Sequence, residues 1–454
     1  MIIFFKKIVQ KLGVDFDIGN TLLLRLWSTV SGALLVLIIP FFLSTPEQGY
    51  YFTFASLIGM QIFFELGFNF VITQMISHEM VNVKVTDGKL DGRRNSVDRI
   101  YSLIAMLVKW YAVISILFFV TVYYIGIHFF NTHGSLHQSD WVYAWFGIVF
   151  CSSLNIFASP FLSVLEGMGF VGRVARLRLY QSIAGYLSLA VLLSFHFKLN
   201  AIPAVSGMAA LFSLIYIFKI KFSVLFSPVY KADKIDVKNK VSISWRHEIF
   251  PFQWRIAISW ISGYFIFQLF NPLVFSNQGA AEAGKLGLLL TIFSTILTLS
   301  MSWVNAKIPS MSRLISCGNR VELNILFKKI FICSLAFNIL LSFMFVVTLK
   351  VMMIMGMPLA DRVSGVNTVV LIAIINIINH IIFCLASYMR AHKEEPLLFN
   401  SVITGVLVAI FAYFMSKYSV FLMISSYLAI LITVTLPWVL ILFRQYNKRK
   451  FIPN

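Results

Sequence analysis

The chain contains a succession of apolar stretches, each long enough to cross a bilayer, and this repetition limits the folds open to it. A helix of about 20 residues crosses roughly 30 Å of hydrocarbon, where backbone groups find no water and must bond within the helix. With 59% hydrophobic and 12% charged residues, a water-soluble fold could not hide the apolar surface. We predict an all-α polytopic membrane protein with about twelve transmembrane helices. The stretches lie approximately at residues 22–43, 50–74, 100–127, 141–165, 179–197, 201–218, 249–275, 286–306, 330–349, 364–389, 397–416 and 420–443.

Lysine and arginine alternate between the two sides of these predicted spans. The N-terminus, the loops after even-numbered spans and the C-terminal tail hold 29 of the 37 Lys and Arg residues, and the loops after odd-numbered spans hold 5. The positive-inside rule places both termini and the basic loops in the cytoplasm. The basic character is therefore explained by topology, and no basic folded domain for nucleic acid is expected. Residues 1–13 fit an amphipathic helix on the inner leaflet.

A basic hydrophilic stretch divides the predicted spans into two equal groups. We predict an N-terminal lobe at residues 1–221 with helices 1–6, a cytoplasmic basic linker at 222–248, and a C-terminal lobe at 249–454 with helices 7–12. Span 1 carries Arg25 before Ser31-Gly32, and span 7 carries Arg255 before Ser262-Gly263. This similarity suggests a duplication of the kind that builds many transporters, with chance likeness of apolar segments as the alternative.

Several motifs resemble sites of other protein classes. The run Gly279–Lys285 lacks the Ser or Thr that a phosphate-binding loop needs, and Gly167–Gly172 follows a membrane helix and reads as a tight turn. His133 and His137 lie in a short outer loop without enough further ligands for a metal. His380 fits a packing residue hydrogen-bonded between helices, or alternatively a residue lining a pathway. We predict no cofactor, no metal site and no catalytic residues.

A few charges lie within the spans, where each is costly and usually functional. Arg25 and Arg255 lie some two turns from the cytoplasmic end, so their side chains could instead reach the interface. Lys109 lies about 15 Å deep. Glu65 is the embedded acid, and it either pairs with Arg25 or Lys109 or acts as an ion-coupling carboxylate. A cavity with this positive balance suits a phosphate-bearing cargo, whereas an exporter of cationic drugs needs embedded carboxylates.

Four segments of the chain resemble bacterial polysaccharide-biosynthesis membrane proteins. These proteins are similar to O-antigen flippases of the multidrug/oligosaccharidyl-lipid/polysaccharide exporter superfamily. The resemblance covers helices 1 to 9 and is most specific at residues 245–270. It rests on Thr45-Pro-Glu-Gln-Gly-Tyr-Tyr-Phe-Thr-Phe with Phe64-Glu65-Leu-Gly67-Phe, on Leu165-Glu166-Gly-Met-Gly169 with Arg176-Leu-Arg178-Leu, on Trp245-Arg-His-Glu248-Ile-Phe-Pro251-Phe-Gln253-Trp254-Arg255-Ile-Ala, and on Ser259-Trp-Ile-Ser-Gly263-Tyr-Phe-Ile-Phe-Gln268-Leu-Phe.

The resemblance implies a two-lobed flippase of the bacterial inner membrane. Its cargo would be an undecaprenyl-diphosphate-linked oligosaccharide, moved from the cytoplasmic to the periplasmic leaflet by alternating access. Family members are thought to use a cationic lumen, which matches Arg25 and Arg255 here, and Lys109 is added on its depth alone. The implied partners are membrane lipids, protons or sodium as coupling ion, and other polysaccharide-assembly proteins.

Three alternatives remain open on the sequence. A drug-cation antiporter of the same fold would bind organic cations, and a peptidoglycan-precursor flippase typically carries helices beyond twelve. An enzyme such as an oligosaccharide polymerase or a lipid-dependent glycosyltransferase commonly needs a large outer loop or paired surface acids, and the sequence shows neither.

Overall fold

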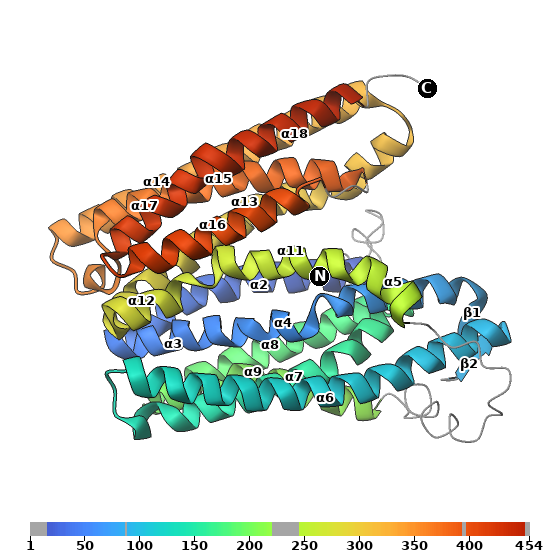
Figure 1. Cartoon of the computed structure of the whole chain (residues 1–454), viewed down its shortest axis with the longest axis horizontal. Coiled ribbons are helices and arrows are strands. Elements are labelled where there is room, and N and C mark those ends of the chain that lie inside the picture. The colour runs from blue at the N-terminus through green and yellow to red at the C-terminus, as the bar shows by residue number, and fades with distance from the viewer. Residues whose placement is uncertain (1–15, 87–88, 220–244, 393–395, 450–454) are drawn as a thin grey trace, which may run out of the picture. The chain divides into compact units, whose positions relative to one another are not determined.

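The computed structural model describes residues 16–86, 89–219, 245–392 and 396–449, and most of this chain is helical (Figure 1). The predicted interfacial helix at 1–13 and residues 222–244 of the predicted linker lie outside the described residues. The longer elements are α2 (Phe16–Phe42), α3 (Thr45–Ile58), α4 (Ile62–Glu65), α5 (Phe68–Glu79), β1 (Val83–Thr86), β2 (Lys89–Gly92), α6 (Arg94–His133), α7 (Gln138–Gly167), α8 (Val171–Ser194), α9 (Pro203–Lys219), α11 (Phe250–Phe267), α12 (Phe270–Gln278), α13 (Ala280–Ser316), α14 (Arg320–Ile354), α15 (Val366–Ala391), α16 (Leu398–Ser416), α17 (Val420–Ile430) and α18 (Leu436–Arg449).

The helices confirm the predicted fold class, that of an all-α polytopic membrane protein. Among the described residues, 11 helices are long and apolar enough to cross a membrane, or up to 12 if one bent pair forms a single span. The bent pair joins Thr45–Glu65 to Phe68–Asn82 at an angle of 45°. This pair covers the second predicted span, so the bend lies within a segment that hydropathy alone would treat as one helix.

Several helices extend well past the apolar segments that predicted them. Helix α6 has 40 residues, α13 has 37 and α14 has 35. At 1.5 Å per residue, α6 is about 60 Å long, roughly twice the thickness of the hydrocarbon. The prediction stopped where charges begin, because a hydropathy criterion detects only the part of a helix that lipid surrounds.

A short antiparallel hairpin follows α5 and was not predicted from the sequence. Strands β1 and β2 pair with Val83 opposite Gly92 and Val85 opposite Leu90. Val83 and Leu90 are buried. The hairpin occupies a basic loop, between the second and third predicted spans.

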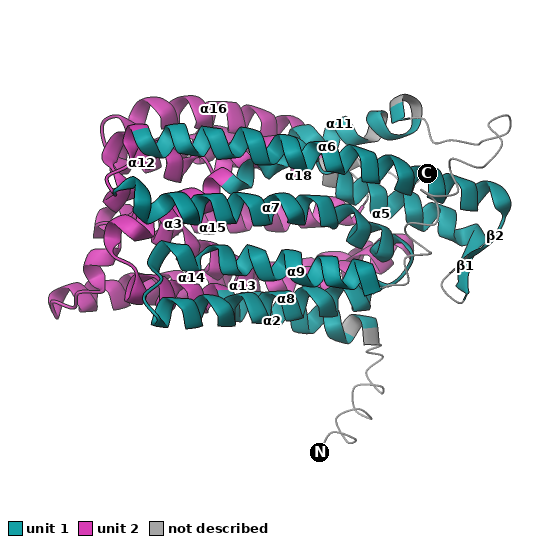
Figure 2. Ribbon diagram, turned by 90° about the horizontal axis from the view of Figure 1, so that it is seen from below, with its two compact units in different colours: residues 1–31, 58–131, 137–260 teal, residues 32–57, 132–136, 261–454 magenta. Residues whose placement is uncertain are grey.

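The chain forms two compact units (Figure 2). Unit 1 comprises residues 1–31, 58–131 and 137–260, and unit 2 comprises residues 32–57, 132–136 and 261–454. Helices α2 and α11 each contribute to both units, and α3 belongs to unit 2 together with α12 to α18. The division into lobes at 1–221 and 249–454 stays a prediction.

Unit 1 is built around large aromatic side chains of α7. Trp141 and Trp145 are fully buried, and Phe130 of α6 packs against both rings, with centroids 5.3 and 5.5 Å away. The indole Nε1–H of Trp145 donates to the carbonyl of Tyr123, at 3.1 Å. Gly126 makes room for this ring, since a Cβ atom at that position would lie 2.2 Å from it. The polar end of the tryptophan is thus satisfied inside the bundle.

Unit 2 has a polar core on α15. His380 is fully buried, and its Nε2 lies 3.1 Å from the hydroxyl of Ser334 on α14. Asn376 Nδ2 donates to Asn338 Oδ1 of α14 at 3.3 Å, and Asn379 Nδ2 donates to the hydroxyl of Tyr427 on α17. These contacts confirm the prediction that His380 is a packing group hydrogen-bonded between helices, because side-chain hydrogen bonds can join helices where apolar contact gives no specificity.

The turn between α7 and α8 is also confirmed. Helix α7 ends at Gly167 and α8 begins at Val171, and Gly169 between them has φ of +93°. Such a conformation favours glycine, so the motif with dinucleotide-binding spacing serves as a helix connection.

Within unit 2, α3 and α13 pack so closely that only glycine fits between them. A Cβ atom at Gly49 would lie 1.8 Å from the carbonyl oxygen of Ala280, and one at Gly284 would lie 2.6 Å from the carbonyl oxygen of Thr45. Gln48 fixes the same contact, because its Nε2 donates to the carbonyl of Gly284 at 2.6 Å. Small residues of this kind allow helix backbones to approach in membranes.

Gly49→Val should destabilise unit 2, because the clash is with backbone that cannot rotate away. We expect a loss of about 1–3 kcal/mol, the range for overpacking, measured as a lower thermal unfolding midpoint of the purified protein. Gly365→Ala is the matched control, since a Cβ atom there meets nothing within 4 Å. Equal unfolding midpoints for Gly49→Val and the wild type would contradict the close contact.

Candidate functional site

The second predicted span breaks at two consecutive left-handed residues. Helix α4 ends at Glu65 and α5 begins at Phe68, with Leu66 at φ +49° and Gly67 at φ +68°. A left-handed leucine is uncommon and costs conformational energy, so the surrounding packing must hold it. A Cβ atom at Gly67 would lie 2.5 Å from Cγ2 of Ile256, which shows how closely α11 approaches the break.

The embedded acid Glu65 sits at this break with neutral partners. Asn69 Nδ2 donates to Glu65 Oε2 at 3.2 Å, and the hydroxyl of Ser159 donates to Oε1 at 3.5 Å. Asn69 Nδ2 also donates to the Ser159 hydroxyl at 3.0 Å, and Tyr111 donates to Asn69 Oδ1 at 3.4 Å. Among the residues that the structure describes, Glu65 forms no ion pair. The carboxylate is therefore positioned by three helices, α5, α6 and α7.

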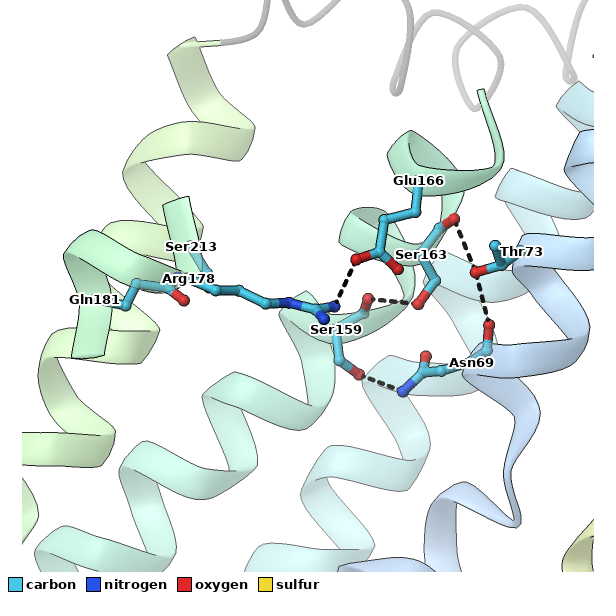
Figure 3. A network of polar contacts seen from close by, with 8 residues as sticks. All are labelled: Asn69, Thr73, Ser159, Ser163, Glu166, Arg178, Gln181 and Ser213. Atoms are coloured by element: carbon cyan, nitrogen blue, oxygen red, sulfur yellow. Dashed lines mark hydrogen bonds and ion pairs between the residues drawn. The ribbon is translucent and has the colours of Figure 1, made fainter. Parts of the chain in front are cut away.

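A ladder of hydrogen bonds joins α5 to α7 and holds these groups in register. Thr73 donates to the carbonyl of Ser163 at 3.2 Å, one turn beyond the contact between Asn69 and Ser159 (Figure 3). Ser77 donates to the carbonyl of Gly167 one turn further, again at 3.2 Å. Each pair is separated by 90 residues, so the two helices run parallel. The sequence indicated this pairing of helices, because polar or small residues occur at every fourth position of both α5 and α7.

Ion pairs hold the charged ends of the unit 1 helices. Arg99 of α6 contacts Glu79 of α5 at 2.8 Å and also pairs with Glu248, just before α11. Arg178 of α8 pairs with Glu166 of α7 at 3.1 Å (Figure 3). Glu166 and Glu248 belong to the segments that carry the family resemblance, but their partners could not be read from the sequence. Because Glu248 lies close to Arg255 in sequence, the Arg99 cluster helps to position the start of α11.

Arg25 lies on the side of α2 that faces away from α8. The indole Nε1–H of Trp27 donates to the hydroxyl of Ser182 on α8 at 2.8 Å, and Asp17 accepts from the N–H of Gly172 at 3.1 Å. Residues two apart on a helix are about 200° apart, so the contact of Trp27 with Ser182 directs Arg25 away from α8. Its side chain is exposed.

Lys109 and Arg255 are also exposed. Lys109 shares its face of α6 with Val113 and Ile116, which are 56% and 63% exposed, so the surroundings of this lysine are otherwise apolar. The guanidinium of Arg255 lies 5.5 Å from the ring centroid of Trp254, a cation–π contact. Within the described part of the chain, neither of these cations forms an ion pair, and neither does Arg25.

All four predicted residues belong to unit 1. The structure brings Glu65 close to α11 through the contact of Gly67 with Ile256, the neighbour of Arg255. No hydrogen bond or ion pair among the described residues joins any two of Glu65, Arg25, Lys109 and Arg255. Across the described residues, no group of three or more His, Cys, Asp or Glu is arranged to hold a metal ion.

The fold is similar to that of solved transporters. One is a multidrug resistance MATE family transporter of the MOP superfamily in an inward-facing conformation, at 11% identity and a TM-score of 0.53, covering 92% of this chain and 99% of that one. Another is the lipid II flippase MurJ in an inward closed conformation, at 11% identity and 0.58, covering 97% and 93%. A third is the MATE multidrug transporter DinF-BH, solved as a complex, at 11% and 0.57, covering 96% and 97%.

No protein-family model and no curated protein matches the chain. At 11% identity, the likeness to solved structures establishes the fold, which is that of MOP superfamily transporters and of a flippase. The substrates named for those proteins belong to them.

The geometry around Glu65 predicts different effects for two substitutions of similar size. Glu65→Gln keeps one acceptor oxygen for Asn69, whereas Glu65→Leu leaves one N–H of Asn69 without its acceptor; the Ser159 hydroxyl can still donate to the carbonyl of Ile156. We expect Glu65→Leu to lose about 1 kcal/mol of stability and Glu65→Gln less, because an unmet donor in a half-buried position is costly. Thermal unfolding midpoints measure the difference, and equal midpoints for the two variants would argue against the network.

Proposed function

We propose that the protein is a flippase that moves an undecaprenyl-diphosphate-linked oligosaccharide, of the O-antigen or a similar surface-polysaccharide type, from the cytoplasmic to the periplasmic leaflet. It would act by alternating access in the bacterial inner membrane, with both termini in the cytoplasm. One observation carries the proposal. Arg25, Lys109 and Arg255 are exposed and, among the described residues, without an ion pair, while Glu65, the acid within the second predicted span, accepts hydrogen bonds from neutral donors.

The sign of these charges favours an anionic cargo. A diphosphate entering a low-dielectric site needs cations to replace its water, and guanidinium groups bind phosphate in a bidentate geometry. Arg25, Lys109 and Arg255 would supply these contacts, while the isoprenoid tail stays in lipid and the sugar crosses a wet cavity. The fold supports a transport role, because it is shared with transporters and with a flippase of a lipid substrate, as their names state.

The same fold also serves multidrug transporters, so an antiporter of organic cations is the principal alternative. A peptidoglycan-precursor flippase is the other, given the similarity to a lipid II flippase. The drug antiporter would need embedded carboxylates to hold its cation. Glu65 is the candidate for that role, and its partners Asn69 and Ser159 are neutral hydrogen-bond donors compatible with an ionised or a protonated acid.

Neutralising either arginine should slow cargo movement without unfolding the protein. We expect Arg25→Gln and Arg255→Gln each to reduce flipping by about tenfold or more, the effect of losing one charge-assisted contact of about 1.4 kcal/mol or more. The measurement is the accessibility of a fluorescent lipid-linked oligosaccharide in proteoliposomes, or its accumulation on the inner leaflet of cells that carry only the variant. Arg25→Lys should retain part of the activity.

Lys84→Gln is the matched control, since Lys84 is exposed on the β1–β2 hairpin. Lys109→Gln should have a smaller effect than the arginine substitutions, because the face of α6 around Lys109 is apolar. Normal flipping by both arginine variants would overturn the proposal. Export of a cationic dye in place of cargo flipping would identify the drug antiporter.

Glu65 is the proposed ion-coupling group, with protons or sodium as the coupling ion. Glu65→Gln keeps one acceptor oxygen for Asn69, and its amide can donate to the Ser159 hydroxyl, but it cannot lose a proton or bind a cation strongly. We expect this variant to bind the lipid-linked cargo normally and to lose the acceleration that an imposed proton or sodium gradient gives the wild type. Gradient-driven flipping at the wild-type rate would exclude Glu65 as the coupling group.

A further inference from the structure

A cavity of about 390 Å³ lies between α13 and α15 in unit 2, away from the residues considered so far. Apolar side chains of both helices complete its wall, and its polar lining consists of Asn305, Ser312, Ser316, Ser387, Arg390 and His392. The volume is within the range of small-molecule sites, and the mixture of an apolar wall with a few polar groups is typical of them.

The lining residues recur at helical spacing on two packed helices. On α13, Asn305, Ser312 and Ser316 fall on one face, separated by seven and four residues. On α15, Ser387 and Arg390 are three residues apart and lie one turn from each other. Two polar stripes thus line a shared space that is open to solvent, since Asn305, Ser316 and Arg390 are exposed.

The cavity offers both hydrogen-bond donors and acceptors. Pro309 lies within α13 and has no N–H, so the carbonyl of Asn305, four residues earlier, lacks its normal helical donor. The hydroxyls of Ser316 and Ser387 donate to the carbonyls of Ser312 and Phe383 at 3.0 and 2.8 Å, which leaves their oxygens able to accept.

The strong donors are Arg390, Ser312 and the side-chain amide of Asn305. The Ser312 hydroxyl makes no hydrogen bond to any other described residue, so it can turn to a ligand. His392 is oriented by its own helix, since Nδ1 lies 3.1 Å from the carbonyl of Tyr388 and must carry the hydrogen of that bond. Arginine with hydroxyl and amide donors is a set that suits a phosphate oxygen.

On the topology predicted from the sequence, this cavity lies at the surface of the inner leaflet. The apolar segment of α13 predicts a span that ends at residue 306, and that of α15 predicts one that ends at 389. Asn305 and Arg390 therefore lie where the two spans leave the hydrocarbon. The basic loops assign this end to the cytoplasm, so the cavity is at the depth of lipid head groups.

We propose that the α13–α15 cavity is a binding site for a lipid-borne phosphate ester with neighbouring hydroxyl groups. The phosphate contacts Arg390, Ser312 and the Asn305 amide. The hydroxyls of the ligand donate to the Asn305 carbonyl and to the serine oxygens. Two lipids carry this chemistry, a glycosyl diphosphate on an isoprenoid and a glycerol phosphate head group. The site does not depend on the proposed function, because either lipid fills it.

The test measures lipid binding to the full-length protein in detergent, with native mass spectrometry as the readout. Undecaprenyl diphosphate and phosphatidylglycerol are the phosphate probes, with undecaprenol and diacylglycerol as phosphate-free counterparts. We expect Arg390→Gln to weaken binding of the phosphate probes about tenfold, Arg390→Lys to weaken it less, and Ser312→Ala to weaken it about threefold. Arg313→Gln is the matched control, since Arg313 is exposed on α13 and does not line the cavity.

The comparison of the probes separates the two sources of phosphate. Tighter binding of undecaprenyl diphosphate than of phosphatidylglycerol identifies the site as one for isoprenoid diphosphates, and equal binding identifies a general head-group site. Both results support the proposal. Binding of undecaprenol or diacylglycerol as tight as that of the phosphate probes, or wild-type binding by Arg390→Gln, overturns it. If flipping of lipid-linked oligosaccharide fails in the wild type while this binding persists, the proposed function is wrong and the site remains.

Discussion

Every backbone N–H and C=O group within the bilayer must find its partner inside the protein, and this constraint selects the helical fold. It also gives meaning to the places where a helix is interrupted. The break at Leu66 and Gly67 adjoins Glu65, and Pro309 releases the carbonyl of Asn305. Interruptions of this kind are tolerated at membrane depth where side chains, water or ligands meet the released groups, so polar chemistry and irregular backbone occur together.

A third interruption follows the same rule. Residues Leu431–Thr435 form a π-helical turn, and the hydroxyl of Thr435 lies 2.9 Å from that of Thr404 on α16. Asn400 Nδ2 donates to the carbonyl of Thr435 at 3.4 Å. Here neighbouring side chains already satisfy the turn, and the result is packing within unit 2. At Leu66 and Gly67 the acid beside the break adds charge, which is why that position has the greater functional interest.

The spans were predictable because a helix that crosses lipid needs a long, uninterrupted stretch of apolar residues. The break at Leu66 and Gly67 was not, because a single glycine is tolerated within a helical pattern and its conformation is decided by packing against Ile256. The long charged extension at the start of α6 was missed for a different reason. Its first turns carry Arg94 and Arg99, and their support comes from ion pairs that hydropathy does not see.

The sequence could nominate residues for the candidate site, but it could not give their contacts. Charge within an apolar segment is costly enough to identify Arg25 and Glu65 in a single sequence. The partner of Glu65 on α7, Ser159, is 94 residues away, and its register is set by a hydrogen-bond ladder that exists only once α5 and α7 have packed. The cavity of unit 2 was missed because its stripes on α13 and α15 are made of common serines, which look like ordinary helix residues until two of them face each other.

If the proposed function is correct, the cations lie at successive depths in the membrane. Arg390 is at head-group level, Arg25 and Arg255 are some two turns inside, and Lys109 is about 15 Å deep. A diphosphate would then exchange one positive partner for the next, so its charge would never lie in hydrocarbon without compensation. Lys109 is the deepest of these cations, and Val113 and Ile116 beside it are aliphatic. The side chain of a lysine on such a face can extend toward water. Its ammonium group can therefore bind phosphate at a membrane depth different from that of its backbone.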